Sequence, residues 1–168
     1  MKTFNTLSST ILFLFAVVTM SAQSKVAHIN SQALISEMPE VKEAQAQLEK
    51  LQKTYAIDIE ASQKEYQTKL QTYAADVQNQ TDVTNQTRQK ELQGMEQNIQ
   101  QYIQTAQQDI QKKQAALLKP LIDKARAAIQ KVAKAQGFDY VIDATEGGSL
   151  ILAEGKDLME EVKVELNF

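Results

Sequence analysis

Between Glu37 and Gly137 the chain runs for about a hundred residues with few helix-breaking residues, and its apolar residues recur every eleven positions. Tyr55, Tyr66 and Val77 form one such row. Eleven residues span three helical turns, so each row stays on one face of a helix with little supercoiling. The other rows are Ile59 with Leu70, then Ile99 with Ile110, Leu121 and Val132, flanked by Met95, Ala106, Leu117 and Ala128. Because the remaining faces are polar, the segment predicts a long, thin arm that packs against one partner helix.

A polar stretch at residues 78–87 (QNQTDVTNQT) interrupts this pattern. Asn and Thr side chains compete for backbone hydrogen bonds and are poor in helix interiors. We therefore expect a helical hairpin over residues 39–136, with its tip near 78–87 and with Asp82 or Thr84 capping the second helix. Gly137 is a typical left-handed residue at a helix end. The alternative is one continuous rod, but folding back supplies a partner for the apolar stripe within the same chain.

Two residues in the second helix are unfavourable for helix formation. Gly94 destabilises a helix interior by about 1 kcal/mol relative to Ala, and Pro120 removes a hydrogen bond. They are either tolerated imperfections or hinges that let the arm bend.

Both flanks of the arm have short strand-like segments. Residues 25–30 (KVAHIN) suit a strand, Ser31 can cap a brief helix over residues 32–38, and Pro39 can begin the arm. After Gly137 the apolar residues alternate over residues 138–145, which indicates a second strand. Gly147-Gly148 then predicts a hairpin turn into a returning strand, Leu150–Ala153.

The C-terminal residues predict a last helix. Asp157 and Glu160 have the spacing of a capping box, and Leu158, Val162 and Leu166 lie on one helical face. Residues 23–38 and 137–168 together therefore predict a small β body, giving an α+β, mostly α, fold. A body this small seldom folds alone, and its strand edges would be exposed. We expect several chains to complete it by oligomerisation.

Residues 1–22 have the features of a cleaved secretory signal peptide. Lys2 precedes an apolar run, Ile11 to Val18, and small residues follow up to Ala22. The run is too short for a membrane-spanning helix. Removing Lys2 leaves 17 basic and 21 acidic residues, a net charge of −4, which gives no support to nucleic-acid binding. The chain has no cysteine, so we expect no lipid anchor, disulfide or thiolate metal site.

No group of residues predicts catalysis, and we expect neither an enzyme nor a cofactor. His28 is the single histidine, so Ser31 has no second histidine to activate it. Asp139 and Asp143 share one face of a strand, where flanking solvated charges are the simpler interpretation. Glu146-Gly147-Gly148 lacks the Lys-Ser/Thr of a phosphate-binding loop.

The arm carries two candidate contact surfaces. The first consists of tyrosines in helical register, which either pack in the hairpin seam or offer contact area to a client: Tyr55, Tyr66, Tyr73 and Tyr102. The second is a basic cluster opposed only by Asp123, which is either a solvated face or a site for acidic segments or lipid headgroups: Lys112, Lys113, Lys119, Lys124, Arg126, Lys131 and Lys134.

Segments on both sides of the arm resemble the Skp/OmpH family of periplasmic chaperones. The most specific are residues 25–41 (KVAHINSQALISEMPEV) and residues 132–144 (VAKAQGFDYVIDA). The sequences LILAE at 150–154 and DLMEEVKVEL at 157–166 complete the similarity, which covers essentially the whole mature chain in order.

The resemblance implies a homotrimer in which a β-barrel body carries three helical tentacles. Such proteins hold unfolded outer-membrane proteins in a central cavity without ATP and pass them to the barrel-assembly machinery. The best-known members are strongly basic, so binding of this acidic chain to lipopolysaccharide or anionic lipid is in doubt. A structural or adaptor coiled-coil protein of the cell envelope is the alternative. The residues that fall on the family's strands are Val26, Ile29, Val141, Ile142, Leu150 and Ile151.

Overall fold

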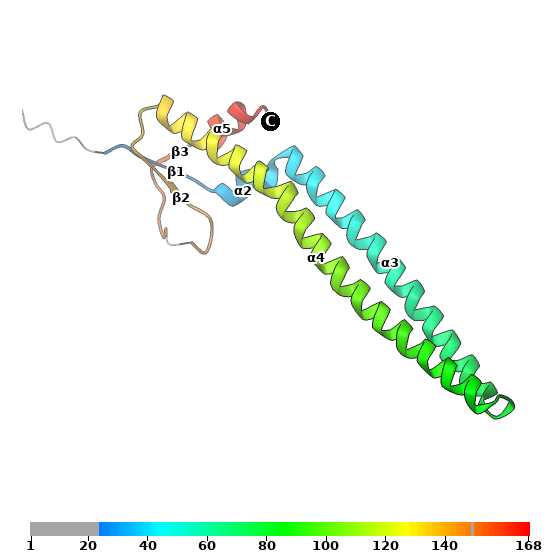
Figure 1. The fold of residues 1–168 in the computed structure, drawn as a ribbon. Helices are drawn as coiled ribbons and strands as arrows, with labels where there is room; N and C mark the ends of the chain where they lie inside the picture. Colours follow the sequence, from blue (N-terminus) through cyan, green and yellow to red (C-terminus); the bar gives the residue numbers. More distant parts are fainter. Residues whose placement is uncertain (1–23, 149) are drawn as a thin grey trace, which may run out of the picture.

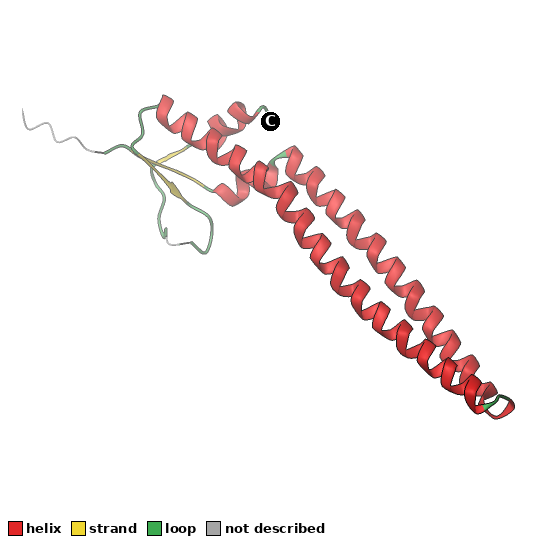
Figure 2. Ribbon diagram, viewed as in Figure 1, coloured by secondary structure: helices red, strands yellow, loops and turns green. Residues whose placement is uncertain are grey.

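Two long antiparallel helices extend from a small body of short strands and helices (Figures 1 and 2). The computed structural model describes residues 24–148 and 150–168, so the predicted signal peptide lies outside the described residues. Helix α3 spans Pro39–Asp76 and helix α4 spans Asp82–Ala135. The predicted helical hairpin is confirmed, and the alternative of a continuous rod is wrong.

The tip of the hairpin is short. A 3-10 turn, η1, spans Val77–Asn79, and the Thr81 hydroxyl oxygen then accepts a hydrogen bond from the Thr84 N–H at 3.2 Å. The cap of α4 is therefore Thr81, and the prediction of Asp82 or Thr84 as the cap is wrong. The Asn- and Thr-rich residues 82–87 lie inside the helix because this earlier cap satisfies its first turn.

The C-terminal end of α4 is capped at Gly137, as the sequence predicts. Gly137 has a φ of +72°, and its N–H donates to the Lys134 carbonyl at 3.1 Å. The Phe138 N–H donates to the Ala133 carbonyl at 3.0 Å. These two bonds form a Schellman motif, which satisfies the last carbonyls and directs the chain into the sheet.

The sheet has three short parallel strands with β1 in the centre. Strand β1 spans Val26–Ile29, β2 spans Tyr140–Asp143 and β3 spans Lys156–Asp157, in the order β2-β1-β3. The predicted hairpin at Gly147-Gly148 is wrong, as is the predicted strand Leu150–Ala153. A turn does form there, since the Gly148 N–H donates to the Thr145 carbonyl, but the chain then continues to β3 without pairing with β2.

Two short helices flank this sheet. Helix α2 spans Ser31–Glu37, and its cap is Asn30, whose Oδ1 accepts a hydrogen bond from the Ala33 N–H at 2.9 Å. The prediction of Ser31 as this cap is wrong. Helix α5 spans Met159–Leu166, and Asp157 accepts a bond from the Met159 N–H without the reciprocal bond of the predicted capping box.

The main hydrophobic cluster lies at the base of the arm. Ala27 and Ile29 on the inner face of the sheet pack in one cluster with residues of α2, α3, α4 and α5. The predicted apolar face of the last helix is confirmed, because all three of its residues are buried: Leu158, Val162 and Leu166. Between Leu48 and Ala106 no described residue is buried, so the distal arm depends on half-buried and polar contacts.

Candidate functional site

The sheet has one covered and one open face. In a parallel pair the residues in register point to the same side. Val26 pairs with Tyr140, and His28 pairs with Ile142, on the face away from the core. The exposed fractions of Val26, Tyr140 and Ile142 are 44%, 61% and 42%. The open face is therefore apolar, although His28 on it is satisfied by the Gly155 carbonyl oxygen at 3.1 Å.

The predicted body residues divide between three environments. Ile29 is buried and Val141 half-buried on the inner side, whereas Val26 and Ile142 lie on the open face. Leu150 and Ile151 lie in the loop between β2 and β3, where the Ile151 side chain is fully exposed. Their role in oligomerisation stays a prediction.

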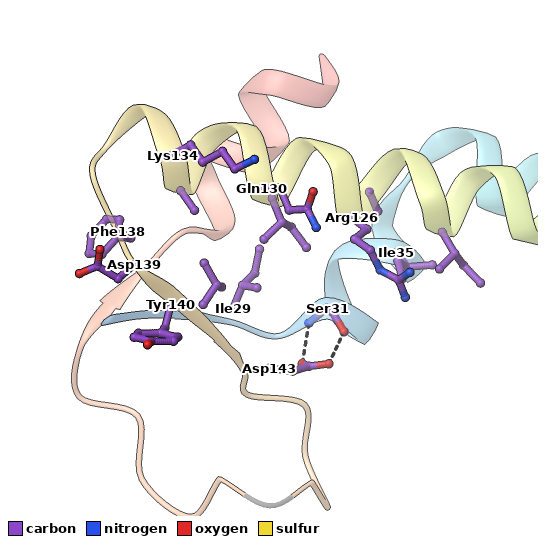
Figure 3. A pocket seen from close by; sticks show the side chains of 15 residues that line it. Ile29, Ser31, Ile35, Arg126, Gln130, Lys134, Phe138, Asp139, Tyr140 and Asp143 are labelled. Atoms are coloured by element: carbon purple, nitrogen blue, oxygen red, sulfur yellow. Dashed lines mark hydrogen bonds between the residues drawn. The ribbon is translucent and has the colours of Figure 1, made fainter. Parts of the chain in front are cut away.

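A cavity of about 470 Å³ lies between the end of α4, the start of α2 and strand β2 (Figure 3). Four charged side chains stand around it: Arg126, Lys134, Asp139 and Asp143. Asp139 accepts a hydrogen bond from the Lys25 N–H, whereas Arg126 and Lys134 form no ion pair with any described residue. Its apolar lining includes Ile29, Ile35, Ile122, Ile129, Phe138 and Val141.

Asp143 joins the end of β2 to the start of α2 at the margin of this cavity. Its carboxylate accepts hydrogen bonds from the Ser31 hydroxyl at 2.5 Å and from the Ser31 N–H at 3.2 Å (Figure 3). The Thr145 hydroxyl donates to it at 2.7 Å. Burial alone would raise the pKa of Asp143, but these hydrogen bonds outweigh it and lower that pKa.

Three of the four predicted tyrosines connect the two long helices through their hydroxyl groups. Tyr55 donates to Asp109 at 2.9 Å and Tyr102 donates to Asp58 at 3.0 Å. The carboxylate acceptors raise the pKa of both phenols, because ionisation would place two negative charges together. Tyr66 is half-buried beside Ile99 and Ile103 in a shallow groove of the arm. Client contact by these residues stays a prediction.

A cluster of polar side chains joins α3 to α4 near the tip of the arm. The Tyr73 hydroxyl donates to Glu91 at 2.7 Å, and Lys69 donates to the same carboxylate at 2.5 Å. Arg88 stacks over the Tyr73 ring at 4.6 Å and reaches Asp76 at 3.2 Å. Hydrogen bonds from Lys69 and Tyr73 lower the pKa of Glu91.

The candidate hinges lie inside a helix that continues through both of them. Pro120 is an interior residue of α4, and so is Gly94. A Cβ atom added to Gly94 would meet no atom of the described residues within 4 Å, so their packing does not require glycine there. Their role as hinges stays a prediction.

The basic cluster at the base of α4 is partly neutralised within the chain. Lys124 binds Glu40 at 2.6 Å and Lys131 binds Glu165 at 2.5 Å, so these pairs join α4 to α3 and to α5. Lys119 binds Asp123 at 2.9 Å. This leaves less free positive charge than the sequence suggests.

The described residues contain no group of three or more His, Asp or Glu side chains that could hold a metal ion. Across residues 24–148 and 150–168, no helix combines the length and apolarity needed to cross a membrane.

Sequence reasoning missed the acceptors that hold the arm and most of the cavity lining. Asp58 carries a local signal because it lies three residues after Tyr55, on the same helical face, but its pairing with Tyr102 depends on the register of the two helices. It also missed Ile57 and Val83, which lie outside the rows of eleven and have exposed fractions of 56% and 74%.

Comparisons with known proteins agree with this architecture. A comparison with curated protein sequences finds no match. Among solved structures, the chain is similar to a candidate outer membrane chaperone (OmpH-like) from Caulobacter crescentus CB15, with a TM-score of 0.77 and 16% identity. The superposition covers 87% of this chain and 85% of that one, which shows a shared fold. The family model described as outer membrane protein (OmpH-like) matches residues 25–166, and the chain therefore belongs to the OmpH-like family.

Proposed function

We propose that this protein is an ATP-independent holdase chaperone of the periplasm. It binds unfolded outer-membrane proteins between helical arms and prevents their aggregation before membrane insertion. The observation that carries the proposal is a thin polar arm on an incomplete body. No residue described between Leu48 and Ala106 is buried, and the sheet leaves Val26, Tyr140 and Ile142 uncovered. Membership of the OmpH-like family and the fold shared with a candidate chaperone support it.

The active form is a homotrimer. A three-stranded sheet with an apolar open face and unpaired edges needs a partner surface. Three copies arranged around an axis would cover these faces at the centre and direct three arms to the same side. The arms would then enclose a cavity whose walls are mostly polar.

The client is bound by many weak contacts. Unfolded β-barrel proteins expose alternating apolar residues that aggregate in water. Isolated aliphatic side chains on the arm, such as Ile57 and Val83, and the half-buried tyrosines supply small apolar contacts without forming a large patch. Bending at Gly94 and Pro120 would let the arms adjust to clients of different size. Release needs no ATP, and the client passes indirectly to the barrel-assembly machinery.

The test is the suppression of aggregation. The purified mature protein is mixed with an outer-membrane β-barrel protein diluted from urea, and light scattering is followed at equimolar trimer. We expect scattering to fall nearly to the level of the buffer. Undiminished aggregation contradicts the proposal.

The length of the hairpin also favours a second class, a structural or adaptor protein of the cell envelope that acts as a spacer. Helix α4 alone has 54 residues, which extend about 80 Å at 1.5 Å per residue. A spacer would leave client aggregation unchanged and would exist as a monomer or a filament.

A further inference from the structure

The groove beside Tyr66, in the distal half of the arm, lies between α3 and α4 and has a volume of about 570 Å³. We call it the Tyr66 groove. Its apolar lining consists of Tyr66 on α3 and of Ile99 and Ile103 on α4. Its polar lining consists of three glutamines and three charged residues: Gln63, Gln67, Gln100, Glu60, Lys64 and Glu96. The groove therefore combines a small apolar strip with a polar rim.

The uncharged polar groups of the Tyr66 groove have no hydrogen-bond partner among the described residues. The other three tyrosines of the arm donate to carboxylates across the hairpin, whereas the Tyr66 hydroxyl does not. The side chains of Gln63, Gln67 and Gln100 likewise form no hydrogen bond within the part of the chain that the structure describes. Each glutamine amide has two N–H donors and a carbonyl acceptor. The rim thus offers both donors and acceptors to a ligand.

The charges around the groove nearly cancel. Lys64 opposes Glu60 and Glu96, so the net charge of the lining is −1. An anion such as a phosphate or a lipid headgroup is not attracted to a lining of this charge. The groove therefore suits a partner whose contacting groups are uncharged.

Hydrogen bonds between the two helices hold the walls of the groove at both of its ends. Toward the base of the arm, the Tyr102 hydroxyl donates to Asp58 at 3.0 Å. Toward the tip, Lys69 donates to Glu91 at 2.5 Å. Because these bonds already fix the walls, little conformational entropy is lost when a ligand enters.

The length of the groove matches a short extended peptide. Its lining spans residues 60–67 on α3 and 96–103 on α4, which is about 10 Å along either helix at 1.5 Å per residue. An extended chain rises about 3.3 Å per residue, so about three residues fit. A helix fits less well, because its backbone groups are already bonded to one another and would leave the glutamine amides without partners.

We propose that the Tyr66 groove binds an extended segment of the unfolded client. One aliphatic or aromatic side chain of the client packs on Ile99 and Ile103. The client's backbone N–H and C=O groups beside it pair with the glutamine amides of the rim and with the Tyr66 hydroxyl. The inference rests on the proposed holdase function and identifies the feature that the arm recognises, an unpaired backbone next to an apolar residue. Every unfolded chain has such a backbone, so recognition does not depend on the order of the client's residues.

The first test measures the affinity of two variants for an outer-membrane β-barrel protein diluted from urea. The test variant replaces the three glutamines of the groove by alanine: Gln63→Ala, Gln67→Ala and Gln100→Ala. Alanine is the best helix former, so the hairpin keeps its fold. The matched control replaces three exposed glutamines of α4 that do not line the groove: Gln97→Ala, Gln104→Ala and Gln108→Ala.

We expect the Kd for the client to rise by about fivefold or more in the test variant, which corresponds to the loss of at least one hydrogen bond. The control variant should bind as the unchanged protein does. Equal affinities of the two variants would overturn the inference.

The second test asks whether the client's backbone is recognised. The probes are an end-capped heptapeptide of alternating valine and serine and the same peptide methylated on its three central backbone nitrogens. Nuclear magnetic resonance of the glutamine side-chain amides should show shifts at Gln63, Gln67 and Gln100 with the first peptide. The methylated peptide should give smaller shifts at the same concentration. Equal shifts with both peptides, shifts confined to Gln97 and Gln104, or no shift at all would each overturn the inference.

The third test excludes a second copy of the chain as the occupant of the groove. Without a client, the assembly formed by the test variant should have the same number of chains as that of the unchanged protein. A smaller assembly would show that the groove holds another copy, and the inference would be wrong.

Aggregation suppression by the unchanged protein separates this inference from the proposed function. If the unchanged protein protects an unfolded outer-membrane protein and the test variant binds that client equally well, only the groove inference fails. If the unchanged protein neither binds nor protects the client, the proposed function fails as well.

Discussion

The ring of Tyr55 on α3 meets the ring of Tyr102 on α4 edge to face, with centroids 5.7 Å apart and an interplanar angle of 66°. Each hydroxyl donates to an aspartate of the opposite helix, Asp109 and Asp58 respectively. The arrangement is reciprocal, so two antiparallel helices are joined twice within a few turns. In a stretch where Ala106 is the only described side chain that is buried, these polar contacts fix the register of the hairpin.

Replacing Tyr55 by Phe should loosen the middle of the arm. The ring contact with Tyr102 remains, but the hydrogen bond to Asp109 is lost. We expect faster backbone amide exchange around residues 55 and 109 and an unchanged rate in the body. Tyr66→Phe is the control, because the Tyr66 hydroxyl has no hydrogen-bond partner among the residues described. Equal effects of the two variants would contradict the role of the bond.

The folded protein should be less stable at acid pH because the Asp143 carboxylate becomes protonated. Its folded-state pKa lies below the ordinary value, so its contribution to stability is present above about pH 4 and is lost as the pH falls through the folded-state pKa. Thermal unfolding at a series of pH values should show this fall. Asp143→Asn should be less stable at neutral pH and show a smaller change between neutral and acid pH. A pH profile identical to that of the unchanged protein would refute the assignment.

The arm was predictable from sequence because its signals are local. Each signal lies within a few helical turns of the chain: the rows spaced by eleven, the polar break and Gly137. Together they predict the hairpin. The strands were less predictable because parallel pairing joins distant segments: Val26 pairs with Tyr140, and Ala27 pairs with Lys156. Leu150–Ala153 has the composition of a strand, yet β1 already has both its neighbours, and nothing in the sequence places β3 at Lys156.

The sequence showed which residues form the two candidate surfaces of the arm, but it did not show which residues they contact. The tyrosine spacing indicated a seam, but the partners Asp58 and Asp109 depend on the register of two helices, which the rows alone do not fix. The basic cluster was overestimated, because Glu40 and Glu165 approach it only after the chain folds.

Truncation of Leu34 should destabilise the body strongly. This side chain of α2 is fully buried in the core between the sheet and the arm. Leu34→Ala should lower the free energy of unfolding by about 2–5 kcal/mol, through lost apolar burial and the resulting cavity. Val83→Ala, at an exposed position, should change it by less than about 0.5 kcal/mol. Urea unfolding followed by circular dichroism measures both, and similar losses in the two variants would be inconsistent with a core confined to the base.

Replacing Gly94 by Ala should make α4 more rigid and reduce the separation that the arms can reach. A Cβ atom at Gly94 meets no neighbour within 4 Å in the described part of the chain, so Gly94→Ala should stabilise α4 by about 1 kcal/mol. If Gly94 is a bend point, distances between fluorescent labels at the arm tips should also become narrower in distribution, and large clients should bind more slowly. Gln93→Ala, at the adjacent exposed position, is the control. Unchanged distances in Gly94→Ala would exclude Gly94 as a hinge.

The mass of the assembly with and without a client tests the central claim most directly. Native mass spectrometry of the mature protein, alone and after an unfolded outer-membrane β-barrel protein is diluted into it from urea, gives both values. We predict a trimer that gains the mass of one client chain and keeps that client soluble. A monomer or a filament that gains no client mass would contradict the account.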